Sequence, residues 1–599
     1  MPAIWVTDLV NRPGRILSFS CLDAAAYLGT SLETLAFWSS LLVLAAARRG
    51  WARHVAAMLG AVLAALLIGG QLYFFKQYGS YVNPDAAQFG AAVSSSVLNQ
   101  LRIDALNFAH HVAGPAFVAL LFAVATRKVS APGASLQRLA LVAAPASVAT
   151  MLLVPCSHRR VQAATPDVLL VQAFAKLASV RMGLSPSTWR HPTARTLAYL
   201  PALRPEAPAF RSVLLIVDEG IRFDVACAAF NPACETMPFS NRAAPDRIAL
   251  LQLRAVDSTT AVSLAVLWSG LSPLEPIDAY QSAPLVFDFA HAAGFKTAFV
   301  SAQDLDFAKA RAFFADLPLD RMAEARDLAE HHDVDVGAPD ESASRRMVSF
   351  LRELGEPFFA AIQYANAHYP YRVDDSFAPF QPCTDSKAPE ENAAFFNRYR
   401  NAVVLHDRAL GELIESVRAA DFGPRTVIVY TSDHGEAFRE HNQLGHGLSI
   451  FDEEVHVPGW VDAPDGTLTQ AERARLAEAS TAFIWHLDIA PTLLDLMGVW
   501  DALELRRHRL QMPGTSLLRG VTSAPVAISN CAAVWGCPFR SWGMMQGSKK
   551  LEAREWDGAW HCFDVLQDPA ERRDLGAQMC GDLAQLAEGQ LGGLPRDGS

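Results

Sequence analysis

The sequence predicts an N-terminal multi-span α-helical membrane domain followed by an α/β domain with a mostly parallel sheet and helices on both faces. Hydrophobic residues make up 51% of the 599 residues, and the mean hydropathy is above zero. Long apolar stretches are concentrated before residue 157, whereas short strand-like runs alternate with helix-like segments after residue 211. We therefore expect a transmembrane domain over 1–156 with four or five spans, a linker with an amphipathic helix over 157–210, and the α/β domain over 211–590.

Four N-terminal stretches approach the roughly 20 apolar residues that a helix needs to cross a bilayer. They are residues 32–47, 55–75, 108–126 and 139–156. Arginines lie between the first two stretches, and Arg127, Lys128 and Arg138 lie between the last two. The positive-inside rule places both loops in the cytoplasm, so everything after Cys156 faces outward. Residues 16–29 are apolar but short and contain Asp23, which leaves a fifth span open.

Charge excludes one class of partner. The chain has 51 Lys and Arg against 62 Asp and Glu, a net charge of −11, so it lacks the basic footprint of a nucleic-acid-binding protein. Cysteine placement is consistent with an oxidising outer compartment. The pairs Cys227/Cys234, Cys531/Cys537 and Cys562/Cys580 would leave Cys383 odd, although free buried thiols are the alternative for each pair.

After residue 211, β-branched and aromatic runs of strand length alternate with helical segments. The runs are residues 213–217, 297–300, 358–363 and 426–430, and the clearest helical segments are 343–353 and 399–417. Alternation of this kind predicts a mostly parallel sheet. In such sheets ligands bind beyond the carboxyl ends of the strands.

Metal-binding residue types follow three of these runs. Glu219 follows the first, His368 the third, and Asp433-His434-Gly435 the fourth, with His446 one loop further on. Each has an ordinary alternative, such as a solvated turn, a helix N-cap or a structural histidine. Together, and in this order along one sheet, they indicate a metal site assembled at its carboxyl edge.

A candidate nucleophile lies in residues 258–263, which precede an apolar helix-like run over 264–267. A hydroxyl there would stand at a helix N-terminus, which favours a phosphate group. A threonine hydroxyl is a weak nucleophile unless a base or a metal lowers its pKa. An ordinary Ser/Thr N-cap is the alternative interpretation of this segment.

These motifs together resemble the alkaline phosphatase/sulfatase superfamily, and specifically its membrane-bound phosphoethanolamine transferases. Residues 217–222 are similar to the family's Glu-x-x-Arg segment, Thr260-Ala261-Val262-Ser263 to its nucleophile motif, and 430–436 with His446 to its metal and phosphate segment. Later landmarks at 457–458, 488–494 and 563–569, and the stretch 73–79 in the membrane part, are similar as well.

The resemblance implies that Glu219, Thr260, Asp433 and His434 bind Zn²⁺, with Mn²⁺ or another divalent cation as alternatives. Thr260 would also be the nucleophile, taking phosphoethanolamine from phosphatidylethanolamine and passing it to lipid A, lipopolysaccharide or another envelope glycan. His368 and His446 would hold the phosphate or transfer protons. It further implies a multi-pass protein of the bacterial inner membrane with a periplasmic catalytic domain.

The sequence departs from the transferase pattern around the nucleophile. Val256 and Val266 stand where the family commonly has a cysteine pair, and 265–268 read Ala-Val-Leu-Trp instead of Pro-Cys-Met-Phe. The absence of a Cys/Ser-x-Pro-x-Arg motif disfavours a sulfatase. A phosphoglycerol transferase, a phosphodiesterase or sulfatase-like hydrolase, and a catalytically silent membrane-anchored binding protein are the alternatives.

Overall fold

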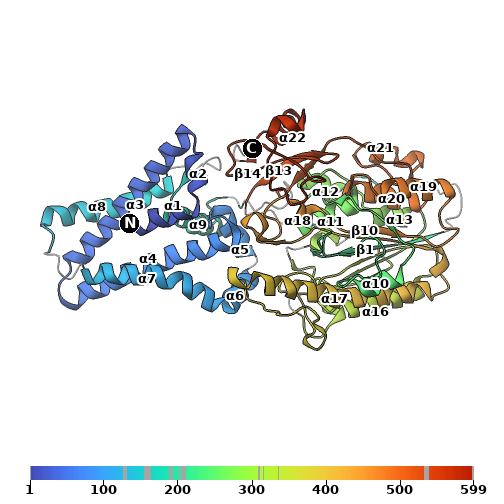
Figure 1. The fold of residues 1–599 in the computed structure, drawn as a ribbon, viewed down its shortest axis with the longest axis horizontal. Coiled ribbons are helices and arrows are strands. Elements are labelled where there is room, and N and C mark those ends of the chain that lie inside the picture. The colour runs from blue at the N-terminus through green and yellow to red at the C-terminus, as the bar shows by residue number, and fades with distance from the viewer. Residues whose placement is uncertain are drawn as a thin grey trace.

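The computed structural model has helices at one end and the α/β domain at the other (Figure 1). This confirms the predicted order of an N-terminal helical domain followed by an α/β domain. The structure describes residues 2–92, 94–125, 131–153, 163–185, 187, 193–197, 199–200, 203, 211–307, 310–314, 316–332, 334, 336–531 and 539–595. Arg127, Lys128, Cys156 and Cys537, used in the predictions above, lie outside these residues.

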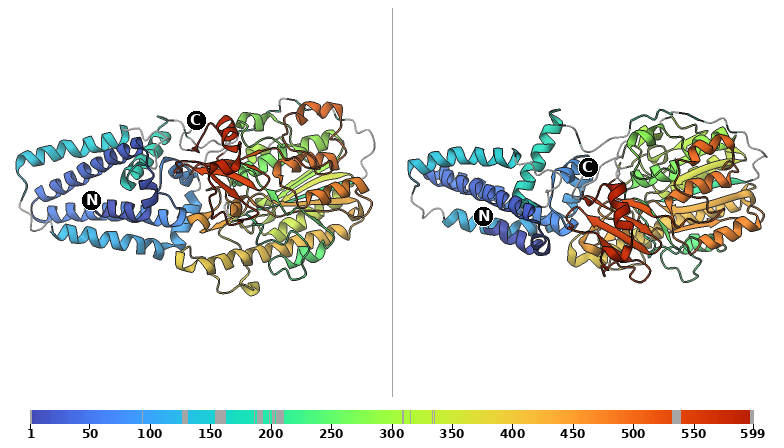
Figure 2. Two further views of the ribbon diagram at one scale, coloured as in Figure 1. Left: turned by 45° about the horizontal axis from the view of Figure 1, so that its top comes forward. Right: turned by 90° about the horizontal axis from the view of Figure 1, so that it is seen from above.

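Within the described part of the chain, three helices are long and apolar enough to cross a membrane: α3 (Cys21–Ala47), α4 (Gly50–Tyr78) and α8 (Ala134–Leu153). A further helix, α7 (Ala105–Ala125), corresponds to the third predicted span and packs along α4, while α3 packs along α8 (Figures 1 and 2). The span assigned to α7 stays a prediction. Residues 16–29 contribute their second half to α3 and do not form a separate long helix.

Shorter helices complete the N-terminal part: α1 (Pro2–Asn11), α2 (Pro13–Leu17), α5 (Pro84–Ala92), α6 (Ser94–Ile103) and α9 (Pro166–Arg181). The sequence indicates α9 only as a bridge, but its first turn is buried against α3. Buried Asp167 accepts hydrogen bonds from Trp38 Nε1 and Thr34 Oγ1, each at 3.0 Å. Because Thr34 and Trp38 are one turn apart, one carboxylate ties α9 to a single face of α3.

The main sheet has seven strands among the described residues, in the order β2-β10-β7-β1-β6-β4-β5. Neighbours from β7 to β5 are parallel, whereas β10 is antiparallel to both β7 and β2. The strands are β1 (Ser212–Asp218), β2 (Ile248–Ala249), β4 (Lys296–Ser301), β5 (Arg321–Ala323), β6 (Phe358–Gln363), β7 (Thr426–Ser432) and β10 (Gly459–Asp462). The four predicted strand runs coincide with β1, β4, β6 and β7.

Helices cover both faces of this sheet, as predicted, so its central strands are buried throughout. Val213, Leu215 and Val217 of β1 belong to the core on one face, and Leu214 and Ile216 belong to the core on the other. The first face is covered by α11 (Thr260–Ser269), α13 (Val286–Ala292) and α20 (Ile489–Leu496), and the second by α10 (Pro238–Ala243), α16 (Asp340–Leu354) and α17 (Asn392–Arg418). The remaining helices of the domain are α12 (Ile277–Ser282), α14 (Arg311–Phe314), α15 (Ala325–Leu328), α18 (Asp452–Val455), α19 (Gln470–Ala479), α21 (Arg506–Arg509) and α22 (Leu583–Leu591).

A smaller antiparallel sheet near the C-terminus was not anticipated from the sequence. It contains β12 (Val526–Ser529), β13 (Ser541–Gln546), β14 (Lys549–Arg554) and β15 (His561–Asp564), with α22 packed against it. Two short pairs, β3 (Leu253–Arg254) with β11 (Ile484–Trp485) and β8 (Ala437–Phe438) with β9 (Leu444–Gly445), complete the strands.

Two of the predicted disulfides are confirmed. Cys227 pairs with Cys234, and Cys562 of β15 pairs with Cys580. Cys531 is also disulfide-bonded, but its predicted partner Cys537 lies outside the described residues. Cys383 is free, as predicted.

The helical part and the α/β domain are joined at the C-terminal end of α4. Arg439 donates to the carbonyl of Lys76 at 2.9 Å and to Gln77 Oε1 at 2.7 Å. Gly79 has a φ of +65°, and a Cβ there would lie 2.8 Å from the carbonyl oxygen of Asn442. This close approach requires glycine, and it brings the predicted family stretch 73–79 against the loop that also carries His446.

Candidate metal and nucleophile site

The predicted site residues gather at the carboxyl edge of the main sheet. Glu219 directly follows β1, and Asp433 and His434 directly follow the neighbouring parallel strand β7. Thr260 is the first residue of α11, so its hydroxyl stands at a helix N-terminus. The structure thus brings together residues that are up to 227 positions apart, from Glu219 to His446.

The Thr260 hydroxyl is the one in its segment that faces these ligands. Its Oγ1 lies 3.0 Å from Glu219 Oε1 and 3.1 Å from His434 Nε2. The two preceding hydroxyls are engaged elsewhere, because Ser258 donates to the carbonyl of Ser449 and Thr259 donates to Asp257. This geometry distinguishes Thr260 from Ser258 and Thr259.

His434 and Glu219 are oriented by hydrogen bonds on the side that faces away from Thr260. His434 Nδ1 lies 2.8 Å from the carbonyl oxygen of Gly435, which can only accept, so Nδ1 carries the proton and Nε2 faces Thr260 and Glu219. This is the arrangement expected around a metal-binding histidine. Glu219 Oε2 accepts a 2.6 Å hydrogen bond from Gln303, whose own amide oxygen accepts from Gln363.

Asp433 presents one carboxylate oxygen with no partner. Its Oδ1 accepts from the backbone N–H of Gly220 at 3.0 Å and of His434 at 2.7 Å. Its Oδ2 is buried, has no hydrogen-bond partner, and lies 3.5 Å from His434 Nε2. A buried carboxylate oxygen without a partner is costly, which is the environment expected where a cation supplies the missing interaction.

His446 and His368 lie on the open side of this group. His446 Nδ1 lies 2.8 Å from Glu436 Oε2, and Glu436 Oε1 accepts a 3.0 Å hydrogen bond from Tyr371. The ring centroid of His446 is 4.2 Å from that of His434 and 5.7 Å from that of His368. His368 Nδ1 has no hydrogen-bond partner, so no hydrogen bond at this nitrogen holds the ring of His368 in place beside the site.

Charge is unbalanced in this cluster. Burial and the nearby Glu219 raise the pKa of Asp433 well above its usual range. Burial alone would raise the pKa of Glu219, but the hydrogen bond and charge of His434 outweigh it and lower that pKa to about 2. Burial alone would lower the pKa of His434, but Asp433 and Glu219 outweigh it and raise that pKa to about 10. The site therefore holds a proton on His434 where a cation would otherwise compensate the carboxylates.

The donor set fits a divalent cation. One ligand atom each from Glu219, His434 and His446 lies within 4.8 Å of the other two, and Asp433 and Thr260 stand beside this group. Carboxylate oxygen and imidazole nitrogen are ligands of zinc and of similar transition metals. His446, which the resemblance assigned to phosphate or proton transfer, is thus also close enough to be a ligand.

Sequence reasoning missed two supporting residues. Gln303 caps Glu219, and it lies two residues after β4, the same strand-end position that identified Glu219 and Asp433. Glu436 was recognised within its motif but given no role, although it orients His446. Polar residues just beyond β4 could have pointed to Gln303.

Fold and site together define an α/β domain with a candidate metal and nucleophile site at the carboxyl edge of its main sheet. Residues 211–499 match the family model described as Sulfatase, so this part of the chain is a Sulfatase-family domain. The matched region contains all six predicted site residues and leaves out the N-terminal helices and the small C-terminal sheet.

Curated relatives match only part of their length. Arylsulfatase K from Bos taurus is 34% identical over 182 residues, which is 29% of this chain and 31% of the relative. Across the curated relatives compared, the chain spans between 15% and 35% of their length.

Solved structures extend the likeness in fold to the membrane part. The integral membrane protein lipooligosaccharide phosphoethanolamine transferase A (EptA) from Neisseria meningitidis is 15% identical, with a TM-score of 0.53 over 84% of this chain and 93% of that chain. The periplasmic domain of EcEptC from Escherichia coli, in complex with Zn, is 17% identical, with a TM-score of 0.41 over 51% of this chain and 87% of that chain.

Proposed function

We propose that this protein transfers phosphoethanolamine from phosphatidylethanolamine to an envelope acceptor such as lipid A. In this proposal the protein resides in the bacterial inner membrane and the α/β domain faces the periplasm. The observation that carries it is the Thr260 hydroxyl, held between Glu219 and His434 at the N-terminus of α11. The overall fold that the chain shares with EptA supports the choice of reaction.

In the first step, Thr260 Oγ attacks the phosphorus of the donor lipid. The new Oγ–P bond replaces the P–O bond to diacylglycerol, which leaves with a proton, and Thr260 carries phosphoethanolamine. Glu219 accepts the hydrogen bond of the hydroxyl at 3.0 Å, which orients Oγ for the attack. The positive end of the α11 dipole favours the phosphate at this position.

In the second step, an acceptor hydroxyl attacks the same phosphorus and the P–Oγ bond breaks. Thr260 regains its proton, and the product is a phosphodiester of ethanolamine and the acceptor. His446 is held by Glu436, and His368 lies beside it, so both are placed on the open side to move a proton or hold a phosphate oxygen.

Glu219, Thr260, Asp433 and His434 would hold the divalent cation, Zn²⁺ in this proposal, with Mn²⁺ as an alternative. When bound, such a cation polarises phosphoryl oxygens and favours an alkoxide over a hydroxyl. The chain itself positions these ligands through the carbonyl of Gly435, the amide of Gln303 and the backbone N–H of Gly220.

The membrane helices support lipid substrates. Arg439 joins the loop before His446 to the end of α4, which keeps the site next to the part that carries the apolar helices. A donor and an acceptor that are both lipids would reach such a site without leaving the bilayer. The arginines between the first two apolar stretches favour a cytoplasmic loop there, and therefore an outward-facing α/β domain.

The test uses the purified full-length protein in vesicles that contain phosphatidylethanolamine and lipid A. We expect phosphoethanolamine-modified lipid A by mass spectrometry, its loss with a chelator, and its recovery with added Zn²⁺. Transfer from phosphatidylglycerol instead would indicate a phosphoglycerol transferase, and release of phosphoethanolamine without acceptor would indicate a phosphodiesterase. If the protein binds Zn²⁺ but catalyses none of these reactions, it is a catalytically silent binding protein, and the proposal is contradicted.

A matched pair of variants assigns the nucleophile. Thr260→Ala is expected to lower the transfer rate by at least about 10³-fold, because nothing else in the segment presents a hydroxyl to Glu219. Thr259→Ala removes a hydroxyl that is already bonded to Asp257, so its transfer rate is expected to stay within about threefold of wild type. Equal losses in both variants would move the nucleophile away from Thr260.

A further inference from the structure

A short hairpin, residues 436–446, runs from the candidate metal site to the helical part, and we refer to it as the site hairpin. Strands β8 and β9 form its stem, with Ala437 opposite Gly445. One residue beyond this pair, Glu436 Oε2 lies 2.8 Å from His446 Nδ1. The base of the site hairpin therefore carries His446 together with the carboxylate that orients it.

The tip of the site hairpin, residues 439–443, contacts the end of α4. Arg439 donates to the carbonyl of Lys76 at 2.9 Å and to Gln77 Oε1 at 2.7 Å, and it also donates to the carbonyl of Lys387. Helix α4 is long and apolar enough to cross a membrane. Two residue pairs of the stem separate these contacts from the base of the site hairpin.

Three residues of the tip have a left-handed backbone conformation. Arg439, His441 and Asn442 have φ values of 76°, 51° and 61°. Residues other than glycine adopt this conformation uncommonly, and it persists where surrounding contacts impose it. The shape of the tip therefore depends on what the tip contacts.

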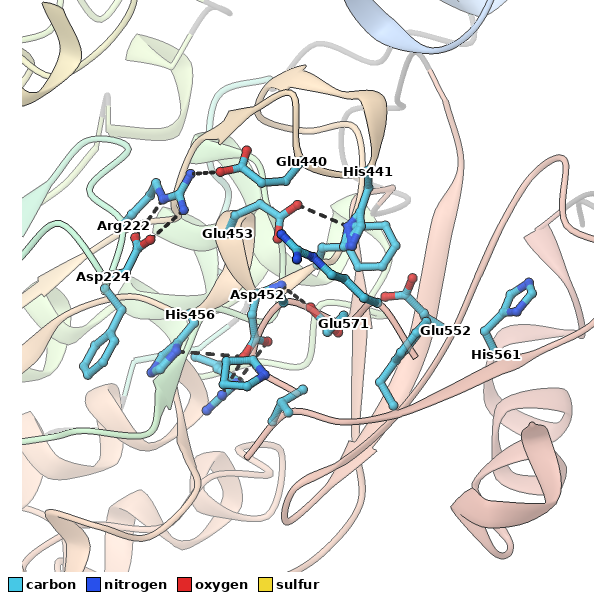
Figure 3. Close-up of a pocket in the computed structure, with 18 of the residues that line it drawn as sticks. Arg222, Asp224, Glu440, His441, Asp452, Glu453, His456, Glu552, His561 and Glu571 are labelled. Atoms are coloured by element: carbon cyan, nitrogen blue, oxygen red, sulfur yellow. Dashed lines mark hydrogen bonds and ion pairs between the residues drawn. The ribbon is translucent and has the colours of Figure 1, made fainter. Parts of the chain in front are cut away.

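The tip lies between α4 and a cavity of about 1040 Å³. On the cavity side, Glu440 pairs with Arg222 at 2.7 Å, as Figure 3 shows, and the ring of His441 stacks on Phe451. The tip residues in the wall of this cavity are Arg439, Glu440, His441 and Asn442. Because the cavity leaves space beside the tip, the bonds of Arg439 to the end of α4 oppose a shift in that direction.

A backbone contact at Gly79 restricts the tip from the opposite direction. Gly79 follows α4 with a φ of +65°, and a Cβ on this residue would lie 2.8 Å from the carbonyl oxygen of Asn442. The tip therefore packs directly on the backbone at the end of α4. Arg439 keeps the tip from moving away, and the backbone at Gly79 keeps it from moving closer.

His446 lies between two glycines, Gly445 and Gly447, which have φ values of 103° and 71°. Beyond His446, the chain is held by Asn530, which donates to the carbonyl of Gly447 at 3.0 Å. Before His446, the chain is held by β9, which pairs with β8 alone among the described strands. Because glycine leaves the backbone its largest freedom, the position of His446 depends on β9 and therefore on the tip.

We propose that Arg439 is a positioning residue that keeps His446 in place at the metal site by holding the tip of the site hairpin against α4. The helical part then contributes to catalysis as well as to anchoring, because the end of α4 sets the position of His446. The catalytic part of this inference rests on the proposed function, whereas the mechanical coupling between α4 and His446 does not.

The first test is hydrogen–deuterium exchange of the full-length protein in detergent. Arg439→Ala is expected to speed exchange at the backbone of residues 444–446 by at least about tenfold, because the tip is released. Arg540→Ala is the matched control. Arg540 also joins the helical part to the α/β domain, at 3.2 Å from Asp85, but it lies outside the site hairpin. Exchange at 444–446 is expected to stay within about twofold of wild type in this control. Unchanged exchange in Arg439→Ala, or an equal increase in both variants, would overturn the proposal.

A second pair of variants acts from the helical part and serves if Arg439→Ala fails to fold, which thermal unfolding reports. Gly79→Ala pushes the carbonyl of Asn442 away from α4, so it is expected to speed exchange at 444–446 as Arg439→Ala does. Gly50→Ala, at the other end of α4, is the control, because Gly50 has a φ of +56° but nothing within 4 Å of the added Cβ. Equal exchange in the two glycine variants would overturn the proposal.

The transfer assay tests whether Arg439 acts through His446. Arg439→Ala is expected to lower the transfer rate about tenfold and His446→Gln about 100-fold, whereas adding Arg439→Ala to His446→Gln is expected to change the rate by less than about twofold. An unchanged rate in Arg439→Ala, or a further tenfold loss in the double variant, would overturn the proposal. If wild type transfers no phosphoethanolamine, the proposed function fails, and the exchange measurements still decide whether α4 and His446 are coupled.

Discussion

Two clusters of buried charge are completed in different ways: the candidate metal site, and the paired network formed by Arg254, Lys550, Asp452 and Glu571. In the paired network, Arg254 and Lys550 meet Asp452 and Glu571 within hydrogen-bond distance. In the metal site, two carboxylates share one imidazole, and Asp433 Oδ2 has no partner. The first cluster is neutralised by its own chain and supports the fold. The second keeps a buried carboxylate oxygen without a partner, which fits the cation of the proposed function.

The largest stability effect is expected in the paired network. Asp452→Ala leaves Arg254 and Lys550 with one fewer buried partner, so the free energy of unfolding is expected to fall by about 3–5 kcal/mol. Denaturant unfolding of the full-length protein in detergent measures this change. A change below about 1 kcal/mol would mean that the network is not a structural element.

A third cluster of buried charge surrounds His406, and its contribution to stability is expected to depend on pH. Burial alone would lower the pKa of His406, but Asp218 at 2.8 Å and Asp340 at 3.0 Å outweigh it and raise that pKa to about 10. A raised histidine pKa stabilises the fold fully below the unfolded value near 6.5, and this stabilisation is lost as pH rises through 10.

We therefore expect the stability advantage of wild type over His406→Gln to shrink by on the order of a few kcal/mol between pH 7 and pH 10. Comparing the two proteins at each pH cancels the titration of groups that they share. An advantage that is constant over this range would show that His406 is neutral in the folded protein.

Metal addition tests the incompleteness of the metal site. Zn²⁺ at about 100 times its dissociation constant is expected to raise the free energy of unfolding of wild type by about 2.7 kcal/mol. Asp433→Asn is expected to lose most of this gain, because the substitution replaces the buried carboxylate oxygen that has no hydrogen-bond partner. Equal Zn²⁺ stabilisation of both proteins would remove Asp433 from the ligand set.

The smallest effect is expected at an exposed ion pair. Arg425 binds Glu356, and their side chains are 57% and 25% exposed. Arg425→Ala is expected to change the free energy of unfolding by less than about 1 kcal/mol, measured as for Asp452→Ala. A loss as large as that of Asp452→Ala would mean that burial does not determine how much an ion pair contributes to the free energy of unfolding.

Local sequence signals predicted the central sheet and the gathered site residues. The runs at β1, β4, β6 and β7 are continuous in β-branched and aromatic residues because both faces are buried, and the site residues follow where such runs end. Gln303 follows the same rule but is an amide, a residue type that rarely signals a metal site.

Tertiary burial accounts for what the sequence did not predict. In β14, Lys550 and Glu552 alternate with apolar residues and look like the solvated face of a strand, yet both are buried. The first turn of α9 looks like part of a polar linker, but Asp167 is buried by partners on α3. Polarity along the chain cannot show that another element covers these side chains.

The most direct test of the proposed mechanism is the intact mass of the purified protein after incubation with phosphatidylethanolamine and Zn²⁺, beside Thr260→Ala. We expect wild type to gain one phosphoethanolamine group and the variant to gain none, since Thr260 presents its hydroxyl to Glu219 and His434. An equal gain by the variant, or none by a wild-type protein with bound Zn²⁺, would contradict a covalent intermediate on Thr260.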